Sequence, residues 1–292
     1  MDLFKILAIL LGIAILSAAA IWALEGVTGF SCVSVLRIDG PIGLESLGPG
    51  TASARAITQK IEDFDAGTSP ALLIEINSPG GSAVASAEIY EALRATNKTT
   101  VAYLSEIAAS GGYYSAAGTD YVVANPNAIT GSIGALTGLI NYEELFQKIG
   151  LRQEAIKSGD LKDIGAPYRN MTEKERQLLQ ELIDETAARF IADVRTGRAG
   201  KLTPAFESML DARILSAQSA KNAGLVDQIG SRKAALQKAA ELGGLDTQTP
   251  SECDITPPSP AFSDLFYDIG SSLGQGFVQG IQTQSKPLRA NA

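Results

Sequence analysis

The sequence contains no histidine, the side chain that most often acts as a general base. Ser-His-Asp triads, Cys-His dyads and metal sites with imidazole ligands all require it. Cysteine is almost as scarce, because Cys32 and Cys253 are the only two and they form no CxxC pair. This excludes thiolate zinc and iron–sulfur sites. Any catalysis must therefore use Ser, Thr, Lys, Tyr, Asp or Glu, and we expect neither a metal nor another cofactor.

An excess of basic residues is also missing. The 292 residues include 24 Lys and Arg against 32 Asp and Glu, which gives a net charge of −8. This balance argues against nucleic acid as a partner, because such binding depends on many contacts between cations and phosphates. The apolar content of 45% and charged content of 19% are typical of a chain that folds. The length allows one large domain or two small ones.

Residues 6–24 form an uncharged apolar run between Lys5 and Glu25. A helix of this length spans about 30 Å, the thickness of the hydrocarbon core of a bilayer. Small residues at 18–20 also fit a cleaved signal peptide, but the run exceeds the roughly 7–15 residues usual for one. We expect residues 1–25 to be an uncleaved, single-pass anchor in the cell membrane, with the bulk of the chain outside the cytoplasm. Either interpretation exports the residues from 26 onward.

The other end of the chain, residues 246–292, is rich in Pro, Gly, Gln and Ser. Such a segment buries too little apolar surface to offset the entropy lost on ordering, and we predict a flexible tail there. Cys32 and Cys253 flank the remaining domain, residues 26–245. A bridge between them is compatible with export, but two cysteines make no disulfide framework. We expect them to be free.

Between these ends, predicted strands alternate with predicted helices. The apolar run at 71–77 is of the kind buried on both faces of a sheet. Thr172-x-x-Glu175 is a capping-box signature, and it opens a long amphipathic helix. The alternation predicts an α/β domain with parallel strand pairing. The other predicted elements are strands at 33–38, 99–105 and 120–124 and helices at 82–95 and 109–117.

Two glycine-rich segments follow predicted strands. Asn77-Ser78-Pro79-Gly80-Gly81 occupies a strand-to-helix corner, where backbone N–H groups beside a helix N-terminus can bind an oxyanion. The same sequence is also ordinary turn chemistry. Ala109-Ser110-Gly111-Gly112 surrounds a serine with small residues and leaves its hydroxyl accessible, although Ser110 also fits the role of a helix cap.

A serine nucleophile needs a base. Lysine is the remaining choice, provided that burial and hydrogen bonds lower its pKa until the amine is neutral. The segment Lys157-Ser158-Gly159-Asp160-Leu161-Lys162-Asp163 offers two lysines, and its local sequence favours neither. A carboxylate beside the base would raise the pKa of the amine. We therefore expect Asp163 to point away from Lys162, toward an arginine.

These segments, together with Thr130-Gly131-Ser132-Ile133-Gly134, resemble the signal peptide peptidase A (SppA) family of serine proteases in order and spacing. The resemblance extends from about residue 33 to residue 232. The interval of 29 residues between Gly81 and Ser110 also resembles that of the ClpP proteases. The resemblance implies a ClpP/crotonase fold, a spiral of ββα units, preceded here by one N-terminal transmembrane helix.

The resemblance also implies roles for individual positions. Ser110 resembles the nucleophile and Lys162 the general base, with Lys157 as the runner-up. Ser132 resembles the hydroxyl that orients the lysine, and the N–H groups of Gly81 and Gly111 resemble the oxyanion hole.

The activity implied is that of a membrane-anchored serine endopeptidase. Its substrates would be signal-peptide remnants or other peptides with small or apolar side chains. Its subunits would form a homo-oligomer in which the serine and the lysine meet across subunits. Three alternatives stay open: a protease specific for stomatin-like membrane proteins, a crotonase-fold protein that acts on acyl-CoA, and a membrane scaffold without catalysis.

Overall fold

The computed structural model describes residues 32–258 apart from 47 and 49. The predicted membrane anchor at residues 6–24 and the end of the predicted tail, from 259, lie outside these residues. Within the described part, no helix combines the length and the apolar character that a membrane span needs.

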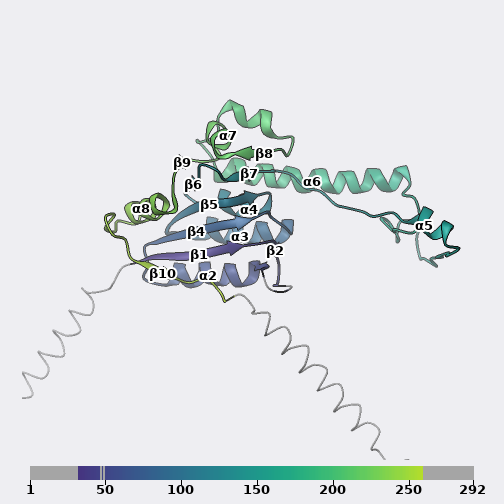
Figure 1. The fold of residues 1–292 in the computed structure, drawn as a ribbon, viewed down its shortest axis with the longest axis horizontal. Coiled ribbons are helices and arrows are strands. Elements are labelled where there is room, and N and C mark those ends of the chain that lie inside the picture. The colour runs from purple at the N-terminus through teal and green to yellow at the C-terminus, as the bar shows by residue number, and fades with distance from the viewer. Residues whose placement is uncertain (1–31, 47, 49, 259–292) are drawn as a thin grey trace, which may run out of the picture.

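A parallel sheet forms the centre of the molecule (Figure 1). Its strands follow the order β10-β1-β4-β5-β6-β9, and β7 pairs in parallel with the end of β5 and antiparallel with β8. The central strands are buried almost throughout, as expected for a sheet covered on both faces. The bounds are β1 Val33–Asp39, β4 Ala71–Ser78, β5 Thr99–Ala109, β6 Tyr121–Ala124, β7 Ile129–Gly131, β8 Ile214–Ser216, β9 Gln228–Ile229 and β10 Glu252–Asp254, with β2 Ile42–Gly43 and β3 Ala52–Ser53 in a separate pair.

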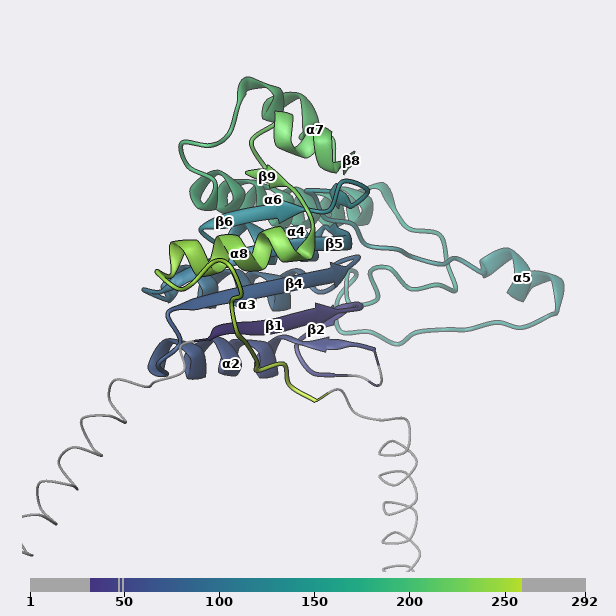
Figure 2. The same cartoon turned by 60° about the vertical axis from the view of Figure 1, so that its left-hand side comes forward.

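Helices cover both faces of the sheet. On one face, α8 (Arg232–Leu242) packs Leu236 and neighbouring alanines against β1, β4 and β5. The opposite face carries α2, α3 and α4 (Figure 2). The predicted α/β class with parallel pairing is confirmed. The remaining bounds are α2 Ala54–Ala66, α3 Ala83–Ala95, α4 Gly111–Ala117, α5 Glu143–Lys148, α6 Glu173–Gly197, the 3₁₀ helix η1 Pro204–Met209 and α7 Ala217–Asn222.

The longest helix, α6, begins as predicted. Thr172 accepts a hydrogen bond from the N–H of Glu175, and the Glu175 carboxylate accepts one from the N–H of Thr172. The apolar stripe of α6 is only partly buried, because the helix continues past the edge of the sheet (Figure 1). Phe190 and Val194 lie in the core, whereas Leu182 is 58% exposed.

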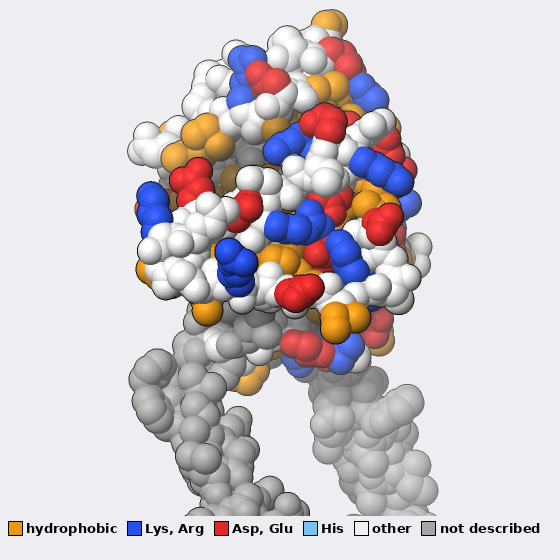
Figure 3. Space-filling view, turned by 90° about the vertical axis from the view of Figure 1, so that its right-hand side faces the viewer, with side chains coloured by type: hydrophobic (Ala, Val, Ile, Leu, Met, Phe, Trp, Pro, Cys, Tyr) orange, Lys and Arg blue, Asp and Glu red, His pale blue; other side chains and the backbone are white. Residues whose placement is uncertain are grey.

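Residues 135–172 form a projecting arm between β7 and α6, with α5 near its tip (Figure 1). Large apolar side chains of the arm face solvent in the single chain: Leu136 is 87% exposed and Ile140 is 77% exposed. Figure 3 looks from the side of the arm and shows hydrophobic side chains between acidic and basic ones. Exposed apolar side chains in this number are typical of a surface that another protein covers.

The expectation of free cysteines is wrong. Cys32 and Cys253 form a disulfide, with their Cα atoms 5.8 Å apart. The bridge joins the residue before β1 to the middle of β10, and the two strands pair in parallel, with Ser34 opposite Cys253. The sequence offered only one possible pairing but no sign that the two cysteines lie close together, because the short strand β10 has no apolar pattern that predicts it.

That strand also corrects the predicted boundary at residue 246. Residues 252–254 belong to the sheet, although all three are exposed. They are fixed by backbone pairing, by the disulfide and by ion pairs from Arg37 to Asp254 (2.8 Å) and from Arg232 to Glu252 (2.6 Å). Such an edge strand carries no apolar pattern, and composition alone therefore assigned it to the tail.

We expect loss of the disulfide to lower the free energy of unfolding by about 2–5 kcal/mol, because the bridge restricts the unfolded chain. The two cysteines are 221 residues apart in the sequence, so the loop that the bridge closes is long. Urea unfolding of a Cys32→Ser/Cys253→Ser variant should show a lower midpoint than the oxidised wild type. Wild type kept in reductant should match the variant. Equal midpoints in all three samples would contradict a stabilising role.

Candidate active site

Three non-glycine residues of the described chain have positive φ angles: Ser110 (52°), Ser132 (54°) and Ala212 (61°). All three line one pocket of about 530 Å³. L-residues rarely adopt this conformation, and strained residues of this kind cluster at active sites. The pocket lies beyond the carboxyl ends of β4, β5 and β7, where parallel sheets commonly bind ligands. It is therefore the candidate active site.

Ser110 stands at the junction between β5 and α4. Its N–H donates a hydrogen bond to the carbonyl of Gly131 (2.9 Å), and its carbonyl accepts one from the N–H of Tyr114 (2.9 Å). Its side chain makes no capping hydrogen bond to α4. Ser110 therefore occupies the N-cap position of α4, as the alternative interpretation expected, but its hydroxyl does not cap the helix and is left to line the pocket.

The two glycine-rich segments meet beside Ser110. A Cβ on Gly80 would lie 2.6 Å from the backbone nitrogen of Gly111 and 2.8 Å from the Cβ of Ser110, so only glycine fits there. A Cβ on Gly111 would lie 2.2 Å from Oγ of Ser86 and would force that side chain to move. The same Cβ on Gly111 would lie 3.2 Å from the backbone nitrogen of Gly81, which places both backbones around one small space. Gly111 opens α4, so its N–H has no acceptor within the helix.

Ser132 follows β7, in which Gly131 pairs with Ala109 of β5. This register puts Ser132 next to Ser110, and the N–H of Ser132 donates to the carbonyl of Arg213 (2.9 Å). The pocket thus brings together four of the predicted site residues. They are Gly81, Ser110, Gly111 and Ser132.

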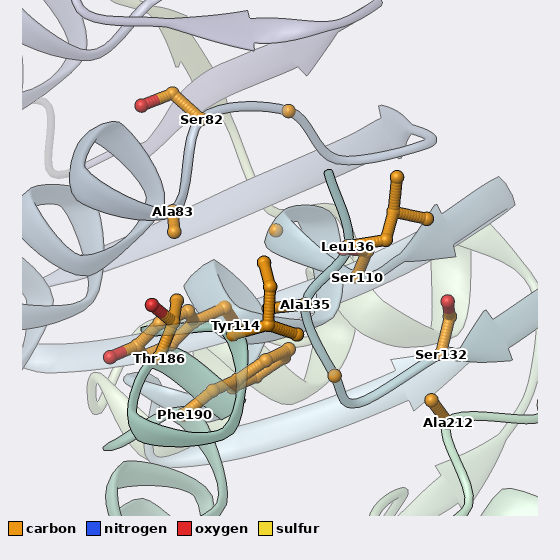
Figure 4. A pocket seen from close by; sticks show the side chains of 14 residues that line it. Ser82, Ala83, Ser110, Tyr114, Ser132, Ala135, Leu136, Thr186, Phe190 and Ala212 are labelled. Carbon is orange, nitrogen blue, oxygen red and sulfur yellow. The ribbon is translucent and has the colours of Figure 1, made fainter. Parts of the chain in front are cut away.

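The opposite side of the pocket is an apolar wall from α4 and α6. Figure 4 shows Tyr114, Thr186 and Phe190 together on one side, away from Ser132 and Ala212. The Phe190 ring stacks on Tyr114, with centroids 4.2 Å apart. The sequence analysis did not predict that residues of α6 line the site, because the amphipathic pattern of that helix indicates only that one of its faces is buried. It also assigned no role to Ala212.

Tyr114 is held in this wall through its hydroxyl. The hydroxyl donates to the carboxylate of Asp193, which also accepts from Nε of Arg189 (2.8 Å). Burial and the hydrogen bond to Asp193 raise the pKa of Tyr114, so the hydroxyl remains a neutral donor. The ring therefore presents a fixed apolar surface to the pocket.

The predicted lysines do not lie in the pocket. Lys162 occupies a turn of the arm, where its N–H donates to the carbonyl of Gly159 (3.1 Å) and its side chain is exposed. Lys157 donates through Nζ to the carboxylate of Asp163 (2.6 Å) and to the carbonyl of Asp160 (3.0 Å). None of the pocket-lining residues of the described chain is a lysine. One subunit alone therefore does not bring Lys162 to Ser110.

Asp163 points to an arginine, which confirms the expectation. Its carboxylate accepts hydrogen bonds from Nε (3.0 Å) and Nη2 (2.7 Å) of Arg169. Arg169 first, and Lys157 second, hold the pKa of Asp163 well below its usual range. The carboxylate next to Lys162 is therefore ionised and fully engaged by other cations.

An accessible, strained serine beside two backbone N–H groups, in a chain without histidine, defines the class as a serine hydrolase that does not use imidazole. Comparison with known proteins narrows the class. The model of peptidase family S49 matches residues 92–246, just over half of the sequence. The chain therefore belongs to peptidase family S49, and it is a serine peptidase of the SppA type.

Relatives bear this out. The chain is 37% identical over 212 residues to "Putative protease slr0021" of Synechocystis sp., which covers 72% of this chain and 76% of that protein. It is 28% identical over 246 residues to "Serine protease SPPA, chloroplastic" of Arabidopsis thaliana, which covers 82% of this chain and 36% of that protein. Among solved structures, a mutant of ClpP1 from Listeria monocytogenes aligns with a TM-score of 0.46 and 16% identity, over 69% of this chain and 94% of that chain.

Proposed function

We propose that this peptidase is a membrane-anchored endopeptidase with a Ser110–Lys162 dyad. Its substrates are peptides with small or apolar side chains, such as signal-peptide remnants. The observation that carries the proposal is the position of Ser110, which sits in a strained conformation between the Gly81–Gly111 corner and an apolar pocket wall. An extended peptide can lie there with its carbonyl at the corner and a side chain against Tyr114 and Phe190.

The reaction is acyl transfer to serine. The neutral amine of Lys162 takes the proton of the Ser110 hydroxyl, and Oγ attacks the scissile carbonyl. The N–H groups of Gly81 and Gly111 donate to the oxyanion that forms. The resulting ammonium, which the Ser132 hydroxyl orients as an acceptor, gives its proton to the leaving amine. Water then loses a proton to the lysine and attacks the ester carbonyl, and the bond from the carbonyl carbon to Oγ breaks to release the acyl product. The lysine returns the proton to Oγ, which restores the Ser110 hydroxyl and the neutral amine.

The lysine comes from a second copy of the chain. Two observations support this assembly: no lysine lines the pocket within the described residues, and the arm that carries Lys162 exposes large apolar side chains. A homo-oligomer would cover those side chains and place the arm of one subunit over the pocket of the next. Lys157 is not the base, since its ammonium is engaged by Asp163.

The location proposed is the outer side of the cell membrane. The uncharged run at residues 6–24 supports anchoring, and the Cys32–Cys253 disulfide supports an oxidising compartment for the domain, because such bridges persist outside the reducing cytosol.

The substrate class can be tested with the full chain in detergent micelles. We expect cleavage of quenched-fluorescence peptides that carry small apolar residues, with internal cuts visible by mass spectrometry. We expect no hydrolysis of acyl-CoA thioesters, the substrates of related folds. Thioester hydrolysis without peptide cleavage would contradict the proposal. Cleavage of a stomatin-type tail in preference to signal peptides would assign the same dyad to a partner-specific protease.

A further inference from the structure

The turn that carries Lys162 has little secondary structure to hold it. It lies in a stretch without helix or strand between α5, which ends at Lys148, and α6, which begins at Glu173. Three backbone hydrogen bonds close the turn, from the N–H groups of Lys162, Ile164 and Ala166. A loop of this length is ordinarily mobile, whereas a base must stay within hydrogen-bond distance of its nucleophile.

Asp163, directly after Lys162, is the point at which the turn is fixed. In addition to Arg169, its carboxylate accepts hydrogen bonds from Nζ of Lys157 (2.6 Å) and the hydroxyl of Tyr168 (3.1 Å). The side chain of Asp163 is 13% exposed. Ion pairs at the surface contribute little to stability, but a shielded carboxylate with several donors is held in one position.

Arg169 continues the connection from Asp163 to α6. While Nε and Nη2 bind Asp163, Nη1 donates to Oε2 of Glu175 (2.9 Å) and Nη2 also reaches Oε1. The Glu175 side chain is 2% exposed and forms the capping box with Thr172. Hydrogen bonds from Arg169 first, and from the Thr172 backbone next, lower the pKa of Glu175 to about 2. One guanidinium therefore ties the lysine turn to the first turn of a 25-residue helix.

We propose that Arg169 is the positioning residue for Lys162. It acts through Asp163 and Glu175, and it makes the lysine turn and α6 one rigid unit. The inference rests on the proposed role of Lys162 as the base. It also gives a role to two other residues of the Lys157–Asp163 segment. Asp163 is the residue through which the turn is attached to Arg169, and Lys157 is the second cation that binds the Asp163 carboxylate.

The planar fork of arginine is essential to this arrangement, because two carboxylates lie on two sides of it. A lysine presents a single point charge and cannot bind both carboxylates bidentately. Arg169→Lys should therefore keep one attachment and lose the other. Asp163→Asn removes the attachment on the Lys162 side and leaves the pair of Arg169 with Glu175.

The test measures kcat and KM separately for an apolar peptide, with the full chain in micelles. We expect Arg169→Ala to lower kcat by about 100-fold, the cost of a displaced catalytic group, with KM within about 3-fold, because the pocket is built from other residues. Asp163→Asn should have an effect of the same kind, and Arg169→Lys should fall between Arg169→Ala and wild type. The matched control is Arg195→Ala, which breaks the bidentate pair of Arg195 with Glu207 (3.0 and 2.9 Å) near the other end of α6 and should leave kcat unchanged.

Circular dichroism and light scattering are measured on every variant. Wild-type kcat in a folded Arg169→Ala or Asp163→Asn oligomer would overturn the inference. The inference would also be overturned if Arg169→Lys and Asp163→Asn both lost kcat and both dissociated into subunits. Arg169 would then be needed for assembly of the oligomer and not for the position of Lys162. Lys162→Ala is run alongside. If Lys162→Ala keeps wild-type kcat, the proposed base fails and the inference fails with it; if only Arg169→Ala keeps kcat, the inference alone fails.

Discussion

Replacing either Ser110 or Lys162 with alanine is expected to lower kcat for peptide cleavage by at least about 10³-fold, the scale at which loss of a nucleophile or its base acts. Ser110→Ala removes the atom that forms the acyl bond. Lys162→Ala leaves the hydroxyl without a base, because the sequence has no histidine to replace it. The measurement is a steady-state assay on a quenched apolar peptide.

The matched control for Lys162→Ala is Lys157→Ala. Both lysines belong to the same segment of the arm, but Lys157 is already paired with Asp163. We expect Lys157→Ala to lower kcat far less than Lys162→Ala, because Arg169 still holds Asp163 when the second cation is removed. Equal cleavage by all the variants would reveal a contaminating protease, and loss in Lys157→Ala with retention in Lys162→Ala would reverse the assignment of the base.

Mixing two inactive variants is expected to restore activity. If each site takes its serine from one subunit and its lysine from a neighbour, a Ser110→Ala subunit still supplies an intact lysine and a Lys162→Ala subunit an intact serine. Random assembly of equal amounts gives about one quarter of sites with both groups. The mixture should therefore recover about a quarter of wild-type kcat after dissociation and reassembly.

Two controls accompany the mixing experiment. Each variant taken alone through the same dissociation and reassembly should stay inactive. The double variant Ser110→Ala/Lys162→Ala mixed with either single variant should stay inactive as well. An inactive mixture of the two single variants, shown by mass spectrometry to contain mixed oligomers, would place the serine and the lysine of one site in a single subunit.

The residues around Ser110 were predictable because their positions depend on local sequence. Gly81, Ser110 and Ser132 each closely follow a strand, and parallel strands bring their carboxyl ends to one edge of the sheet. The wall of the pocket was not predictable in the same way. Phe190 reaches Tyr114 across 76 positions of the sequence, and only the packing of α6 on α4 decides which face of that helix meets the pocket.

The disulfide and β10 were missed for a related reason. An exposed strand of three residues has no hydrophobic period to detect, and its pairing with β1 is a long-range contact. Lys162 is not among the described residues that line the pocket, and local sequence could not show how it lies relative to Ser110. Local sequence did predict that the Asp163 carboxylate would turn toward an arginine, and its contact with Arg169 confirms this.

The bridge between Cys32 and Cys253 closes nearly the whole described chain into a covalent ring. A single cut anywhere in that ring, including in the projecting arm, yields two pieces that remain one molecule until the bridge is reduced. The C-terminal piece produced by such a cut therefore stays linked to the N-terminal piece through the disulfide. This holds even when the cut falls between Ser110 and Lys162.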